Sequence, residues 1–163
     1  DLIGFMTPDD YSRLADKLLA LGTKMTSFKS GPRGFYLKTG SSDMFNAMGA
    51  AKPGDFEEWS ERELWSPAFS SPKISATGSG DSAVAGFIAA FLKGLSPEKA
   101  LQYANCLGWE NIQELDAISG IQTWDKTTEL LAQGMAQDEI DLSDSDWRWN
   151  ETHKLWVGPN DKL

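Results

Sequence analysis

The sequence predicts an α/β fold, and two observations support that prediction. First, a helical segment at residues 7–22 is followed directly by two strand-like segments, an order that is typical of α/β proteins. Second, residues 79–92 predict a helix that is apolar on every side, which indicates burial against a sheet. The chain has 163 residues, which is enough for one domain with a sizeable core.

The first helix is bounded by capping signals. It begins after Thr7, a favourable N-cap residue, and Pro8 occupies its first position, while Gly22 ends it. Leucines at helical spacing predict its buried stripe: Leu14, Leu18 and Leu21.

Strand-like segments come next. Residues 24–40, KMTSFKSGPRGFYLKTG, predict a strand, a glycine turn and a second strand in which Phe35 and Leu37 alternate with other residues. Residues 41–72 are poorly periodic and rich in glycine and proline, so we expect a long irregular insertion there. Within it, a short strand is expected near residues 63–69.

Two further helices follow the apolar helix at residues 79–92. The next one has Ser96 as its N-cap and Pro97 at its first position. A third helix is expected at residues 124–136. The inner face of the helix that begins after Ser96 is predicted to consist of Ala100, Leu101, Ala104 and Leu107.

The last 28 residues, 136–163, read as an acidic tail that is distinct from residues 1–135. Within this tail, residues 147–158, WRWNETHKLWVG, predict a hairpin that packs its tryptophans on the rest of the domain.

Charge and cysteine content exclude several classes of function. The net charge of −9 argues against nucleic acid or anionic membranes as partners, because both are bound mainly through Lys and Arg. The longest apolar run, residues 83–92, is too short to span a bilayer, and no signal peptide is visible. Cys106 is the only cysteine, so no intrachain disulfide can form, and a cytoplasmic location is expected.

The stretch Gly78-Ser79-Gly80-Asp81 lies immediately before the apolar helix. Glycines at a helix start let several backbone N–H groups converge, and together with the helix dipole they can hold an oxyanion. A carboxylate at the same place suits phosphoryl transfer, in which Asp81 would remove a proton from the attacking hydroxyl. The alternative is that Asp81 is an ordinary first-turn acid of a buried helix.

Four segments together resemble the C-terminal half of the ribokinase-like (pfkB) carbohydrate kinases. They are KSGPRG at residues 29–34, ATGSGDSAVAGFIAAFLKG at 76–94, SPEKALQYANCLG at 96–108 and DAISGI at 116–121. The resemblance covers residues 7–131 and implies a three-layer α/β/α fold with a mostly parallel central sheet. It assigns residues 1–135 to the nucleotide-binding part of such a domain.

The resemblance also implies roles for individual residues. Asp81 would be the catalytic base that activates a sugar hydroxyl, and ATP and Mg²⁺ would be the cofactors. No residue of this chain is assigned as a metal ligand. The anion hole would comprise Gly78, Ser79 and Gly80, and the nucleotide-binding residues would be Lys29, Gly31, Gly34, Asn105 and Gly108.

Members of this family are about twice as long as the chain, and their N-terminal half supplies most sugar contacts. Here Ser75-Ala76 precedes the glycines where the family has Asp-Thr, and Asn-x-x-Glu occurs only at residues 111–114, after the Gly-Asp motif. We therefore expect the 163 residues alone to transfer phosphate very poorly. A second copy of the chain or a missing N-terminal half would complete the enzyme.

Two other readings of the sequence remain open. The chain could be a kinase remnant that binds nucleotides or proteins without catalysis. The Gly-Asp-Ser sequence also occurs in esterases, where Ser82 would be the nucleophile and His153, the only histidine, its base. Asn150 occupies the place of the acid that would orient that imidazole.

Overall fold

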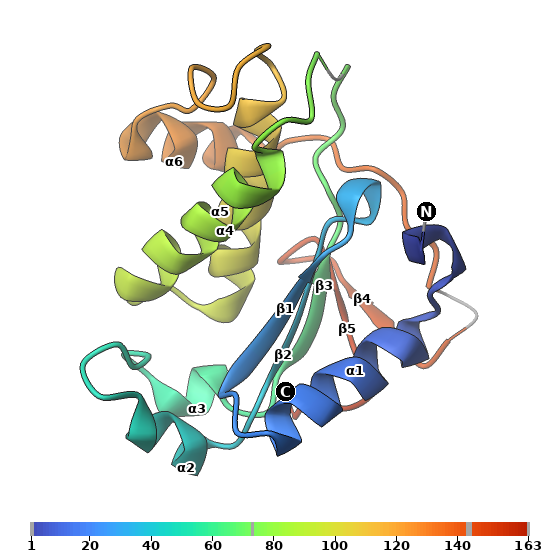
Figure 1. Cartoon of the computed structure of the whole chain (residues 1–163), viewed down its shortest axis with the longest axis vertical. Coiled ribbons are helices and arrows are strands. Elements are labelled where there is room, and N and C mark those ends of the chain that lie inside the picture. Colours follow the sequence, from blue (N-terminus) through green and yellow to red (C-terminus); the bar gives the residue numbers. More distant parts are fainter. Residues whose placement is uncertain (1, 73, 143–144, 163) are drawn as a thin grey trace.

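The computed structural model describes residues 2–72, 74–142 and 145–162, and its centre is a five-stranded sheet (Figure 1). The strands follow the order β1-β2-β3-β5-β4 across the sheet, and every neighbouring pair is antiparallel. Their bounds are β1 Met25–Lys29, β2 Phe35–Thr39, β3 Glu63–Ser66, β4 Arg148–Asn150 and β5 Leu155–Val157.

The antiparallel pairing shows that the expectation of a mostly parallel sheet was wrong for this chain. A parallel pair needs a crossover connection of a dozen or more residues. Residues 30–34 alone join β1 to β2, and residues 151–154 alone join β4 to β5, so both pairs are hairpins. Strand β3 then pairs antiparallel with β2, with Trp65 opposite Tyr36.

Helices flank the sheet, and the predicted ones are present. The helix predicted at residues 124–136 ends at Gln133, because Gly134 turns the backbone to a φ of 79°. Three 3₁₀ turns occur at Leu2–Phe5, Gly31–Arg33 and Asn46–Met48. The α-helices are α1 Pro8–Ala20, α2 Ser42–Phe45, α3 Phe56–Trp59, α4 Ser79–Leu92, α5 Pro97–Asn111 and α6 Trp124–Gln133.

One face of the sheet is covered by α4 and α5, with α6 outside them (Figure 1). Phe35 of β2 stacks on Phe87 of α4 with ring centroids 5.8 Å apart. The predicted inner face of α5 is confirmed, since Ala100, Leu101 and Ala104 are fully buried in this core and Leu107 packs against it.

The opposite face is covered by α1 and by part of the C-terminal segment (Figure 1). Its core is aromatic: Tyr11 lies 4.5 Å from Trp65 between ring centroids, and Trp147 packs on both Trp65 and Tyr36. The sheet therefore has helices on both faces, as the α/β prediction requires.

The buried stripe of α1 differs from the predicted one. Tyr11 and Ala15 are buried, whereas Leu14, Leu18 and Leu21 are 42%, 37% and 83% exposed. Tyr11 reaches the aromatic cluster on the sheet, which fixes the rotation of the helix and turns the leucine stripe outward. The predicted N-cap is confirmed, because the Thr7 side chain accepts a hydrogen bond from the Asp10 amide.

Helix α4 packs against the sheet, as predicted, but only through one side. Its inner face, with Phe87 and Ala90, packs on the sheet and α5. Its outer face leaves Ile88 49% and Leu92 63% exposed.

The C-terminal hairpin is present and belongs to the sheet. Strand β5 pairs with β3, and Leu155 and Val157 are buried in the core beneath α4 and α5. The residues after β5 are held as well, since Asp161 accepts hydrogen bonds from the Arg62 side chain and the Glu63 amide.

Across the residues that the structure covers, no helix is both long enough and apolar enough to pass through a membrane.

Candidate functional site

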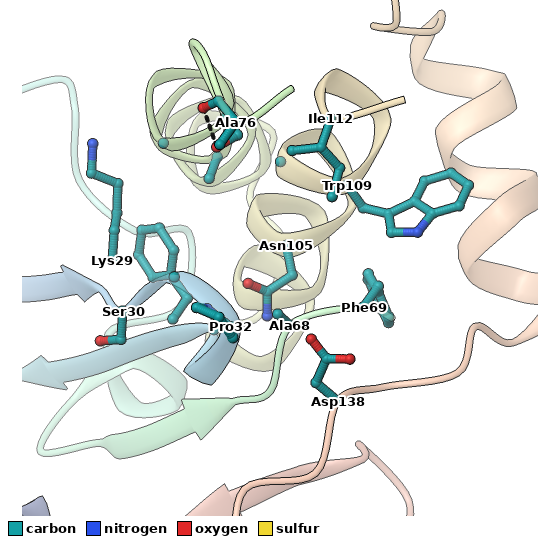
Figure 2. A pocket seen from close by; sticks show the side chains of 17 residues that line it. Lys29, Ser30, Pro32, Ala68, Phe69, Ala76, Asn105, Trp109, Ile112 and Asp138 are labelled. Carbon is teal, nitrogen blue, oxygen red and sulfur yellow. Dashed lines mark hydrogen bonds between the residues drawn. The ribbon is translucent and has the colours of Figure 1, made fainter. Parts of the chain in front are cut away.

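A cavity of about 240 Å³ lies where the hairpin turn after β1, the segment after β3, the start of α4 and the middle of α5 meet (Figure 2). Seven of the nine residues predicted from the sequence line it, although they come from three separate segments. They are Lys29, Gly31, Gly34, Ser79, Gly80, Asn105 and Gly108. Gly78 and Asp81 do not line the cavity but lie beside its entrance, at the start of α4.

The start of α4 is shaped by Gly78, which is the N-cap residue. Its φ of 81° lies in the left-handed region, and a Cβ there would come within 2.8 Å of the Ala117 Cβ. Within the described residues, the amides of Gly78 and Gly80 donate to no acceptor. These free N–H groups, at the positive end of a 14-residue helix, can bind an oxyanion.

Lys29, the last residue of β1, adds a full positive charge to this helix start. A Cβ built on Gly80 would lie 2.9 Å from the Lys29 Nζ, so the ammonium group sits directly against the first turn of α4. The Lys29 Nζ also lies 3.7 Å from Oδ1 of Asp81. An acidic chain thus gathers its helix dipole and a lysine at one end of the cavity.

Asp81 occupies the first turn of α4, and its side chain is 93% exposed. It therefore stands on the solvent side of the helix start, whereas Ser79 and Gly80 face the cavity. A carboxylate in that place can reach a second molecule that approaches the helix start from outside the cavity.

The turn between β1 and β2 is held rigidly at the other side of the cavity. Gly34 has a φ of 83°, and a Cβ there would come within 2.0 Å of the Ser66 carbonyl oxygen. The Arg33 carbonyl accepts a hydrogen bond from the Trp65 indole at 2.7 Å. Gly31, also at positive φ, has open space around it, so its backbone is accessible from the cavity.

Asn105 and Gly108 bring α5 to the cavity. The Asn105 amide nitrogen donates to the Ser66 and Pro67 carbonyls at 3.0 and 2.9 Å, which ties α5 to the end of β3. This bonding leaves the Asn105 carbonyl oxygen as the group that can meet a ligand. A Cβ on Gly108 would be 3.4 Å from the Ser79 carbonyl, so the glycine keeps this wall of the cavity open.

The far end of the cavity contains residues that the sequence patterns did not single out. Phe69 and Trp109 provide aromatic side chains, and Asp138 enters from the segment after α6 (Figure 2). The Trp109 indole donates to the Ser70 carbonyl at 3.0 Å. Trp109 directly follows the predicted Gly108 and could have been suspected, but no local pattern marks Asp138 or Phe69.

The described residues contain no group of three or more His, Cys, Asp or Glu side chains placed to hold a metal ion.

Ser82 and His153 are not brought together. Ser82 lies in the first turns of α4, whereas His153 lies in the turn between β4 and β5 and lines a different cavity with Arg62 and Arg148. In the part of the chain that the structure covers, no hydrogen bond joins them. Instead, the His153 amide donates to Asn150 Oδ1 at 3.0 Å, so Asn150 shapes the turn.

The sequence matches a known protein family. The sequence profile of the pfkB family carbohydrate kinases matches residues 2–124. A search of curated protein sequences finds no match.

Three solved structures share the fold. A protein from Clostridium perfringens described as a sugar kinase aligns with a TM-score of 0.63 and 18% identity, over 84% of this chain and 37% of that one. Ribokinase from Thermotoga maritima aligns at 0.57 and 22%, over 78% of this chain and 35% of its own. The nucleoside kinase of Methanocaldococcus jannaschii aligns at 0.57 and 21%, over 78% and 38%. The chain thus spans little more than a third of their lengths.

Proposed function

We propose that this chain, which belongs to the pfkB family of carbohydrate kinases, carries the nucleotide-binding part of an enzyme that transfers a phosphoryl group from ATP to a sugar hydroxyl. The nucleotide-binding residues predicted from the sequence lie within residues 1–135. Residues 136–163, expected to be an acidic tail, contribute the hairpin of β4 and β5 to the same sheet. One observation supports this proposal above all. The cavity combines the free amide of Gly80 at the start of α4 with Lys29 and the open turn at Gly31.

The phosphate chain of ATP is assigned to the basic end of the cavity. The amides of Gly78, Ser79 and Gly80 receive the transferred phosphoryl group, where the helix dipole and Lys29 oppose its growing negative charge. The Ser79 amide exchanges its 3.3 Å hydrogen bond to the Ala76 carbonyl for this contact. Gly31 and Gly34 lie along the remaining phosphates, and Asn105 and Gly108 lie near the base. Mg²⁺ would be held mainly by the phosphates and by water, because proteins commonly supply only one or two carboxylates to this ion.

Asp81 is assigned as the general base. Its exposed carboxylate lies next to the helix start but outside the cavity, so a hydroxyl that approaches the phosphate from solvent meets it first. Asp81 accepts the proton of that hydroxyl as its oxygen attacks phosphorus, and ADP leaves.

The acceptor sugar is assigned to polypeptide beyond these 163 residues. Strand β1 is an edge strand, and exposed apolar side chains of α1 and α4 flank the sheet on its two faces: Leu14, Leu18 and Leu21, and Ile88 and Leu92. Unpaired edges and apolar patches of this kind favour association. A missing N-terminal half, or a second copy of the chain, would cover them and orient the sugar.

Without that part, the chain has a base and an anion site but nothing to position the acceptor. Positioning supplies roughly 7–11 kcal/mol of barrier lowering in well-oriented reactions. We therefore expect the isolated 163 residues to bind nucleotide but to be nearly inactive. A catalytically silent remnant that works by association is the second candidate, and the same exposed apolar surface favours it.

The test is Asp81→Asn in the complete kinase. We expect turnover to fall by roughly 10²–10⁴-fold while the affinity for ATP is retained, because the substitution removes the base but not the anion site. Asp125→Asn is the matched control, since Asp125 is likewise an exposed first-turn acid, of α6. Equal turnover in the Asp81 and Asp125 variants would remove Asp81 from the mechanism.

A further inference from the structure

We propose that Asp138 recognises the base of the nucleotide, by accepting a hydrogen bond from its amino group at the end of the cavity remote from Lys29. This inference rests on the proposed function, because it takes the ligand of the cavity to be a nucleoside triphosphate. Asp138 lies beyond residues 2–124, the part of the chain that the family profile matches.

The backbone of Asp138 is fixed against the segment that follows β3. The Asp138 amide donates to the Ala68 carbonyl at 2.8 Å, and the Ser70 amide donates to the Ala136 carbonyl at 2.9 Å. Between these bonds, Phe69 and Gln137 form an antiparallel bridge. The chain after α6 is therefore paired with a wall of the cavity, and Asp138 keeps a defined position there.

The side chain of Asp138 is held by one oxygen and leaves the other available. Oδ1 accepts a hydrogen bond from the Ser70 hydroxyl at 2.7 Å. Within the described residues, Oδ2 has no hydrogen-bond partner, and Figure 2 shows the carboxylate directed toward Asn105 and Phe69. An ionised carboxylate can only accept hydrogen bonds, so its ligand must present a donor.

The two ends of the cavity differ in charge, and this difference orients a nucleotide. Lys29 and the start of α4 attract phosphates at one end, whereas a carboxylate at the other end repels them (Figure 2). Phe69 and Trp109 line the Asp138 end of the cavity. Their aromatic side chains provide apolar surroundings, which suit the flat nucleotide base better than the polar ribose. An amino group on the nucleotide base is the donor that fits both the aromatic walls and the free Oδ2 of Asp138.

The experiment compares two triphosphates that differ only in that amino group. Binding of ATP and of purine riboside 5′-triphosphate, which lacks the 6-amino group, is measured by calorimetry on the full chain. We expect the unmodified protein to prefer ATP by about tenfold or more, as for a hydrogen bond to a charged group. In Asp138→Ala the preference should shrink to about twofold or less, whereas Asp138→Asn should keep part of it, because its amide oxygen still accepts a hydrogen bond without the charge.

Using the ratio of the two affinities cancels the general effect of removing a negative charge. Glu139→Gln is the charge control, because Glu139 is the exposed neighbour and does not line this cavity. Ser70→Ala controls for the lost Ser70 hydrogen bond while it keeps the carboxylate. Both controls should retain the preference for ATP, and they also show whether a loss in the Asp138 variants reflects misfolding.

The possible failures are distinguishable. If Asp138→Ala keeps the preference for ATP, or if the unmodified chain binds both triphosphates equally and shows no Asp138-dependent preference for GTP, the role of Asp138 is overturned while nucleotide binding stands. If neither triphosphate binds, the proposed function falls as well. GTP serves as a third ligand: a preference for GTP that depends on Asp138 would keep the role and assign it to the guanine amino group.

Discussion

The side chain of Arg62 forms hydrogen bonds with three segments that are far apart in the sequence. Its buried guanidinium donates to Glu98 Oε1 at 2.6 Å, to Asp161 Oδ2 at 3.0 Å and to the Glu58 carbonyl at 3.0 Å. It thus links the insertion before β3, the first turn of α5 and the C-terminal residues. Burial by itself would raise the pKa of Glu98, but the Arg62 charge and hydrogen bond outweigh it and hold that pKa below its usual value.

This pair predicts how stability depends on pH. Because the pKa of Glu98 is lower in the folded state than in the unfolded state, its contribution is complete above the unfolded value. It is lost as the pH falls through the folded value. Glu98→Gln should lower the free energy of unfolding at neutral pH by about 3 kcal/mol, since it leaves a buried arginine poorly paired. It should also flatten the loss of stability below pH 4.5.

Urea unfolding at several pH values measures both effects. Glu57→Gln is the control, because Glu57 forms an exposed ion pair with Lys162, and such pairs contribute about 0–1 kcal/mol. If Glu98→Gln and Glu57→Gln unfold alike at every pH, the Arg62 cluster does not stabilise the fold as argued.

Individual residues also show where sequence reasoning succeeds. The Gly78–Asp81 stretch and the glycines of the β1–β2 turn were predicted from local patterns, since positive φ and helix starts leave a mark in adjacent residues. Asp138 and Phe69 could not be predicted, because pairing between residues 68–70 and 136–138 brings them together across a long separation. No neighbour in the sequence encodes that contact.

Among the secondary-structure elements, α4 and α5 pack closely against each other, and both contribute residues to the cavity. Gly86 lies at their contact, where a Cβ would be 2.8 Å from the Tyr103 carbonyl. A glycine inside a helix ordinarily costs about 1 kcal/mol relative to alanine, so its presence here reflects the close packing of the two helices.

Gly86→Ala should therefore destabilise the protein despite its better helix propensity. Separating the two helices strains a tightly packed core, and we expect a loss of roughly 1–3 kcal/mol. Gly108→Ala, in α5, is the matched control: the new Cβ meets only ordinary contacts at 3.4 Å and beyond, so stability should hold or rise. Thermal unfolding measures the stability of both variants. If Gly86→Ala is as stable as the unmodified protein, the contact between α4 and α5 does not require a glycine.

The elements themselves were largely predictable, but their relations were not. Capping residues and periodicity located α1, α4, α5 and the two hairpins. The direction of the strands was misjudged because it follows from how short the connections are, as in the turn at residues 30–34. The rotation of α1 was misjudged because one aromatic residue, Tyr11, outweighs three leucines when it reaches an aromatic core.

At the scale of the whole molecule, the sheet separates two unlike halves. On one side α4 and α5 build the cavity, and on the other α1 and the aromatic cluster give the sheet a firm support. The C-terminal hairpin extends the sheet beyond β3, so that β1 and β4 are its two edge strands. The acceptor-binding part that we propose would join at the β1 edge, beside the exposed side chains of α1 and α4.

In the proposed function, the start of α4 and the β1–β2 turn bind the phosphates of a nucleotide. The most direct measurement is a titration of the ¹⁵N-labelled chain with MgATP, followed by the backbone amide signals. We expect the largest shifts at Gly78, Ser79 and Gly80, with further shifts at Gly31 and Gly34. Saturating MgATP that leaves these five amides unmoved, or that shifts only amides elsewhere, would contradict the claim.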